Sequence, residues 1–79
     1  LKNLPVDFVK IDGNFVRDLL QDPFDRAIVQ SIHDIATAMD IQTVAEFVES
    51  PEIAKHLTDM GINFGQGYGI AKPQPLYTN

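Results

Sequence analysis

The sequence contains no cysteine, so it can form neither a disulfide framework nor a thiolate metal site, and a cytoplasmic setting is the simplest expectation. Basic residues are also few, because 6 Lys and Arg stand against 11 Asp and Glu and give a net charge of −5. That balance argues against nonspecific binding to nucleic acid polymers or to an anionic membrane. No apolar run approaches the ~20 residues of a membrane span, so we expect no membrane contact by this segment, although a longer parent protein could be anchored elsewhere.

The composition is that of a small soluble domain. The chain has 79 residues, of which 44% are hydrophobic and 22% are charged, which is enough for one compact unit. Position 1 is Leu rather than Met, and we therefore expect the chain to be the interior of a longer protein.

The pattern along the chain predicts strands that alternate with helices. β-branched and aromatic residues predict strands at 6–11, 43–48 and 62–68, and helices are expected at 25–39 and 51–60. One or two further helical turns are expected within residues 14–20, and residues 73–79 have the character of an exit linker. Strands that alternate with helices form βαβ units, so the sequence predicts an α/β fold with a parallel sheet.

Several single residues support these boundaries. Ser50 and Pro51 favour a helix start, and Gly61 favours a left-handed stop after the second long helix. In the first long helix we expect one buried apolar stripe, and we expect His33 to lie off that stripe and to be exposed. The predicted stripe consists of Ile28, Ile32, Ile35, Ala36 and Met39.

Each predicted strand ends in polar residues that the strand itself does not need. Because parallel strands end at the same edge of a sheet, these side chains are expected to converge on one rim. Carboxylates there can hold hard divalent cations, a lysine can neutralise a phosphate oxygen, and a glutamine can bind both a water and a phosphate. Gly65 and Gly67 are expected to let a ligand approach the backbone, and Glu49 is equally well explained as a solvated loop residue. The rim residues are Lys10, Asp12, Glu46, Glu49 and Gln66.

Three segments match motifs of a known family: LKNLPVDFVKIDGNFVRDL at 1–19, TVAEFVES at 43–50 and GQGYGIAKPQP at 65–75. With these motifs the chain resembles the C-terminal third of an EAL domain, the cyclic di-GMP phosphodiesterase family. The resemblance implies a TIM-like (β/α)8 barrel with one antiparallel strand, of which this chain would hold the last three strands. It also implies an EAL segment over residues 1–76 and a tail over residues 77–79, so the barrel is incomplete.

The resemblance further implies hydrolysis of cyclic di-GMP to pGpG with two Mg²⁺ or Mn²⁺ ions. Carried over by position, Glu46 would serve a metal, Lys10 would position the nucleophilic water and balance phosphate charge, and Gln66 would orient water and substrate. Substrate contacts would come from Gln66, Gly67, Tyr68 and Pro73, and Asp12 and Glu49 match family positions with less defined roles.

Two departures from the family pattern stand out. Phe47 replaces the usual glycine of the Val-Ala-Glu-Gly-Val-Glu motif, and we expect it to alter loop packing or the guanine site. Residues 69–71 also differ from the usual Leu-Phe-Gly, a change that should alter ligand packing more than chemistry.

The Glu-Ala-Leu motif and most metal ligands of the family lie outside this sequence, so we expect the 79-residue piece to be inactive alone. Exposed strand edges should make it associate with itself or with the rest of the barrel. Two alternatives remain: a degenerate EAL domain that binds cyclic di-GMP as a receptor without cutting it, and a purely structural fragment.

Overall fold

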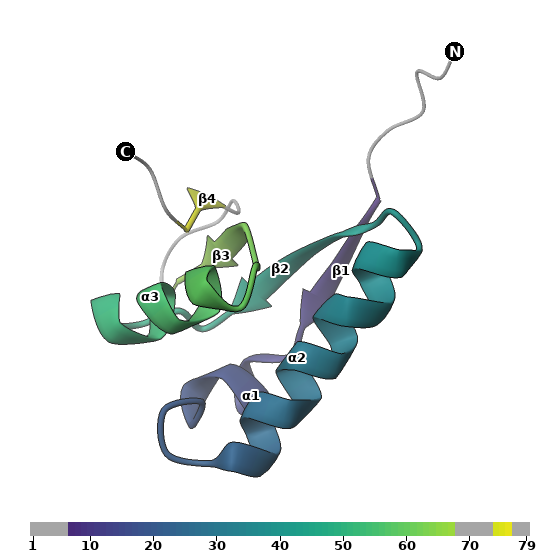
Figure 1. The fold of residues 1–79 in the computed structure, drawn as a ribbon. Helices are drawn as coiled ribbons and strands as arrows, with labels where there is room; N and C mark the ends of the chain where they lie inside the picture. Colours follow the sequence, from purple (N-terminus) through teal and green to yellow (C-terminus); the bar gives the residue numbers. More distant parts are fainter. Residues whose placement is uncertain (1–6, 68–73, 77–79) are drawn as a thin grey trace.

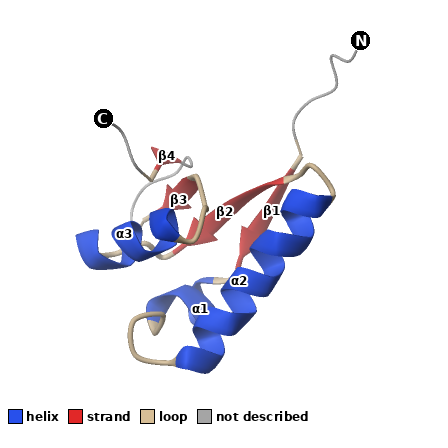
Figure 2. Cartoon of the chain, in the orientation of Figure 1, coloured by secondary structure: helices blue, strands red, loops and turns tan. Residues whose placement is uncertain are grey.

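The computed structural model describes residues 7–67 and 74–76, and it forms one sheet covered by helices on one face (Figure 1). The strands and helices alternate as the sequence predicts (Figure 2). In chain order the elements are β1 (Phe8–Ile11), α1 (Gly13–Arg17), α2 (Pro23–Ala38), β2 (Gln42–Glu46), α3 (Pro51–Asp59), β3 (Phe64–Gln66) and β4 (Gln74–Pro75).

The sheet has the strand order β1-β2-β3-β4. β2 pairs in parallel with both β1 and β3, whereas β4 pairs antiparallel with β3. The register places Ile11 beside Ala45 and Ala45 beside Gly65, so these three residues share one face of the sheet. Side chains one position away in each strand occupy the opposite face, because successive residues of a strand alternate.

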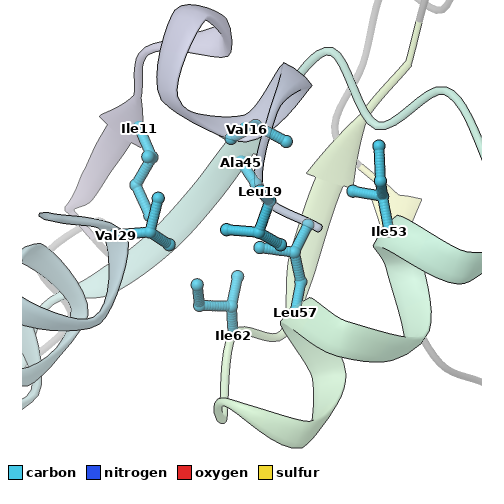
Figure 3. Packing of buried hydrophobic residues seen from close by; sticks show 8 residues of the cluster. All are labelled: Ile11, Val16, Leu19, Val29, Ala45, Ile53, Leu57 and Ile62. Atoms are coloured by element: carbon cyan, nitrogen blue, oxygen red, sulfur yellow. The ribbon is translucent and has the colours of Figure 1, made fainter. Parts of the chain in front are cut away.

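The hydrophobic core lies between the sheet and the helices (Figure 3). Ile11 and Ala45 come from the strands and are fully buried against apolar side chains of the helices and loops. All three helices therefore stabilise the same face of the sheet. The helix and loop members of this cluster are Val16, Leu19, Val29, Ile53, Leu57 and Ile62.

The opposite face of the sheet carries an aromatic contact. The rings of Phe8 on β1 and Phe64 on β3 meet edge to face with centroids 5.7 Å apart. Val44, on the strand between them, is only 1% exposed. This face nevertheless stays open at its edge, since Phe8 is 48% exposed.

Local sequence signals explain where the helices begin and end. Asp22 and Ser50 accept hydrogen bonds from the backbone N–H groups of Phe24 and Ile53, at 2.9 and 3.1 Å, and so cap α2 and α3. A proline occupies the first turn of each of these helices. Gly61 has a φ of 99°, which confirms the left-handed stop predicted after α3.

The predicted buried stripe of α2 is partly wrong. Ala36 is buried, but Ile35 and Met39 are 63% and 64% exposed, and Val29 is fully buried instead. The buried face is thus turned toward Val29 and Ala36, which are seven residues apart and lie on one side of a helix. His33 lies on this same side, and the expectation that it is exposed was wrong, because it is only partly exposed and contacts the sheet.

β4 was not predicted from the sequence, which suggested a linker there. Leu76, directly after β4, donates its N–H to the Asn63 carbonyl at 2.8 Å and packs against the hydrophobic core. Gly65 makes room for it, because a Cβ on Gly65 would collide with the Leu76 side chain and would lie 2.9 Å from Val48 Cγ2. The short strand therefore depends on tertiary packing that a local pattern does not contain.

The strand boundaries otherwise agree with the prediction to within about two residues. Predictions for residues 1–6, 68–73 and 77–79, including the strand ends at 6 and 68 and the tail, lie outside the described residues. Within the described residues, no helix has the length and apolar character needed to cross a bilayer.

Candidate functional site

A pocket of about 190 Å³ opens at the ends of the central strands. Three of the five residues that the sequence analysis placed on the rim line this pocket: Lys10, Glu46 and Gln66. Phe47 and Gly67 complete the lining. The structure thus brings an ammonium, a carboxylate and an amide to one place.

The strand register explains this convergence. Glu46 and Gln66 are the last residues of β2 and β3, and they are direct neighbours in the parallel ladder. Neighbouring strands lie about 4.8 Å apart, so the two side chains leave the sheet side by side. Lys10 pairs with Val44, two residues before Glu46, and therefore points to the same face of the sheet.

The carboxylate of Glu46 also has a backbone partner. The N–H of Gly13, the first residue of α1, donates to Glu46 Oε1 at 3.4 Å. Glu46 is only partly exposed, so this contact orients its side chain at the mouth of the pocket. The sequence analysis did not predict this role of Gly13, because a backbone donor has no signature in the sequence.

Phe47 occupies an unusual backbone conformation beside the carboxylate. Its φ is 61°, in the left-handed region that non-glycine residues seldom adopt. The turn lets the next residue, Val48, donate its N–H to the Gln66 carbonyl at 3.2 Å. The Phe47 ring lies against Gly13, and the Arg17 guanidinium carbon is 5.5 Å from the ring centroid.

Two other predicted site residues lie outside the pocket lining. The side chain of Asp12 accepts a hydrogen bond from the Asn14 N–H at 2.8 Å and caps α1, which is a structural task. Glu49 is exposed in the loop before α3. Gly67 lines the pocket as expected for ligand approach, but Gly65 faces the core and Leu76 instead. Tyr68 and Pro73 lie outside the described residues.

The described part of the chain lacks the ligands of a complete metal site. Within residues 7–67 and 74–76, the structure has no group of three or more His, Cys, Asp or Glu side chains that could hold a metal ion. A hard divalent cation requires about six oxygen ligands. Glu46 fits the role of one such ligand, but these residues do not make a complete metal centre.

The sequence matches the EAL domain family over residues 1–73. The chain belongs to the EAL domain family. The motif resemblance seen in the sequence is thereby confirmed.

Several curated EAL relatives match nearly the whole chain. It is 57% identical over 76 residues to the cyclic di-GMP phosphodiesterase PdeB of Shewanella oneidensis, covering 96% of this chain and 9% of that protein. It is 46% identical over 76 residues to the probable cyclic di-GMP phosphodiesterase PdeA of Escherichia coli K12, covering 96% of this chain and 10% of that protein. The chain therefore spans about a tenth of the length of these relatives.

Solved EAL structures have the same fold. The EAL enzyme Bd1971, in a form bound to cAMP and cyclic di-GMP, aligns with a TM-score of 0.77 and 46% identity over 94% of this chain and 20% of that chain. The EAL domain of Mycobacterium smegmatis DcpA aligns with a TM-score of 0.74 and 41% identity over 96% of this chain and 34% of that chain. The EAL chain is thus an α/β unit of the TIM-barrel type with a mostly parallel sheet.

Proposed function

We propose that this chain forms the last three parallel strands of an EAL barrel, over residues 1–76, and that the complete domain hydrolyses cyclic di-GMP to pGpG. The observation that carries the proposal is the pocket in which Lys10, Glu46 and Gln66 meet at the carboxyl ends of parallel strands. Barrel enzymes build their active sites at that end. The names of the curated relatives support the same reaction.

The side chains of Lys10, Glu46 and Gln66 have different roles in the proposed reaction. The Lys10 ammonium, exposed at the rim, neutralises charge on the scissile phosphate and holds the attacking water in place. The Gln66 amide has both a donor and an acceptor, so it can orient a water and a phosphate oxygen together. Gly67, also in the lining, leaves its backbone open to the substrate, and Tyr68 and Pro73 are proposed as further substrate contacts.

EAL phosphodiesterases depend on metal ions. Two bound Mg²⁺ or Mn²⁺ ions would supply a nucleophilic water at neutral pH and offset the charge of the phosphate. Glu46 would give one carboxylate ligand, held in orientation by the Gly13 N–H. The other ligands must come from parts of the domain beyond the described residues, so the isolated piece should not turn over substrate.

The open edge of the sheet suggests how the piece completes its fold. Among the described residues, β1 pairs with β2 alone, and the strand exposes Phe8. An unpaired edge next to exposed apolar surface favours the addition of another strand. We therefore propose that this edge pairs with the preceding strand of the same barrel, and that the isolated chain self-associates.

The test is hydrolysis of cyclic di-GMP by the complete EAL domain that contains this chain, with Mg²⁺ or Mn²⁺. Glu46→Gln keeps the shape of the side chain but removes its charge, and it should lower kcat by more than about tenfold, or ~1.4 kcal/mol of activation free energy. Glu52→Gln, an exposed position in the first turn of α3, is the matched control and should keep full activity.

Binding and turnover separate this reaction from the alternative receptor function. Saturable binding of cyclic di-GMP by a folded domain without production of pGpG would overturn the enzymatic proposal and favour a receptor. Turnover that survives Glu46→Gln within about tenfold would remove Glu46 from the metal site.

A further inference from the structure

The backbone at Phe47 is strained for a residue with a side chain. Within the described part of the chain, only Asp40 and Phe47 are non-glycine residues with a positive φ, and both have a φ of 61°. Such a conformation persists only where the surrounding contacts hold it. The contacts of the Phe47 ring therefore show what holds the backbone in this conformation.

The ring is held by the first turn of α1. A Cβ placed on Gly13 would lie 2.8 Å from Phe47 Cε2 and even closer to Cγ and Cδ2, so the ring occupies the space above the bare glycine. Arg17, one helical turn further on, places its guanidinium carbon 5.5 Å from the ring centroid. Gly13 itself is buried.

The same glycine holds the functional carboxylate. Gly13 N–H donates to Glu46 Oε1 at 3.4 Å, while the ring of Phe47, the residue after Glu46, fills the space where a Cβ on Gly13 would lie. Glu46 and Phe47 thus both contact Gly13 of α1. Glu46 accepts the Gly13 N–H, and the Phe47 ring packs where Gly13 has no side chain.

We propose that Phe47 is a positioning residue, whose ring fixes Gly13 so that the Gly13 N–H orients the Glu46 carboxylate in the pocket. The proposal rests on the phosphodiesterase function proposed above and deepens it. It also predicts that the effects of substitutions at Phe47 and Gly13 are coupled. The Phe47 ring fits only over a glycine at position 13, and the ring keeps the Gly13 N–H directed at the Glu46 carboxylate. The backbone strain at Phe47 is the cost of this arrangement.

The first experiment is a double-mutant cycle in the complete domain. Phe47→Gly should lower kcat by about 10- to 100-fold, the range for loss of a group that orients a metal ligand, with a much smaller change in KM. Phe47→Tyr keeps the ring and should retain kcat. Gly13→Ala should also be impaired, because its methyl group meets the ring. In Gly13→Ala/Phe47→Gly the methyl group has room, so the double variant should be no worse than Phe47→Gly alone.

Asp40→Gly supplies the matched control. It relieves the same left-handed strain in the loop between α2 and β2, away from the residues that line the pocket. It should raise Tm without changing kcat. A loss of kcat in Asp40→Gly equal to that in Phe47→Gly would show that strain alone, and not orientation of Glu46, causes the effect.

A readout that does not need activity is the amide proton shift of Gly13 in the complete domain without metal. Glu46→Ala, which removes the acceptor, should move this shift strongly when Phe47 is present and only weakly in the Phe47→Gly background, because there the N–H no longer faces the carboxylate. An effect of Glu46→Ala as large in the Phe47→Gly background as in the parent, or purely additive effects in the cycle, would overturn the inference. A parent that hydrolyses nothing would overturn the proposed function alone, because the amide shift still decides the coupling.

Discussion

His33 Nδ1 lies 2.9 Å from the hydroxyl oxygen of Thr43, so a histidine of α2 is tied to the middle strand of the sheet. Thr43 is 2% exposed, and its hydroxyl depends on a protein partner rather than on water. The other ring nitrogen, Nε2, is 3.4 Å from Thr37 Oγ1 and would be 3.0 Å from a Cβ on Gly61. This histidine therefore connects α2, β2 and the turn after α3.

Removal of the Thr43 hydroxyl should destabilise the fold. Thr43→Val has the same shape but leaves the His33 nitrogen without its partner, and it should cost about 1–3 kcal/mol of the free energy of unfolding. Urea denaturation of the complete domain measures this loss. Ser31→Ala, which removes an exposed hydroxyl from the same helix without touching His33, should stay within about 0.5 kcal/mol. Equal losses in the two variants would contradict a special role for the His33–Thr43 pair.

A methyl group at position 65 should be poorly tolerated. Gly65→Ala places a carbon where the Leu76 side chain packs and 2.9 Å from Val48 Cγ2, and it should cost about 1–3 kcal/mol of the free energy of unfolding. Because Gly65 faces the core, KM for cyclic di-GMP should change little when the domain is folded.

The double variant Gly65→Ala/Leu76→Ala tests the cause of that loss. It should be more stable than the sum of the two single losses predicts, because the smaller side chain makes room for the methyl group. If the stability losses of the two single variants simply add in the double variant, as measured by thermal unfolding, then the Leu76 side chain is not what excludes a methyl group at position 65.

The start of α2 should make stability depend on pH. Partial burial, which strips water from the carboxyl, raises the pKa of Asp25 above its ordinary value, and the nearby charges of Asp22 and Asp18 raise it further. The folded state then holds this proton more tightly than the unfolded state, so stability falls as pH rises from the ordinary pKa through the raised one. The loss is complete once the pH lies above the raised pKa.

Asp25→Asn should flatten this part of the pH profile and raise stability at neutral pH relative to the parent. Chemical denaturation at a series of pH values between about 3 and 7, around the ordinary range of aspartate pKa values, measures both effects. The exposed Asp34→Asn variant retains Asp25 and should retain the slope. An unchanged slope in Asp25→Asn would contradict the assignment.

The sequence predicted the parts of the fold that depend on local patterns. The three parallel strands, both long helices, the Ser50 cap and the Gly61 stop were predicted because propensity and backbone chemistry determine them. The meeting of Lys10, Glu46 and Gln66 was also predictable, since it follows from the order of parallel strands.

The features that the sequence did not reveal depend on distant contacts. Val29 and Ile35 are both apolar helix residues, and only the position of the sheet decides that Val29 is buried. β4 forms because Leu76 packs over Gly65, a match between residues that no local window contains. The link from Gly13 to Glu46 spans 33 positions and involves a backbone donor, which has no signature in the sequence.

The edge-to-face contact of Phe8 and Phe64 has a consequence for shape. Their strands are separated by β2, so rings whose centroids are 5.7 Å apart must lean toward each other over the middle strand. We expect this contact to favour a concave bend on that side of the sheet. In the barrel proposed above, such a bend would let the neighbouring strands continue the same curve.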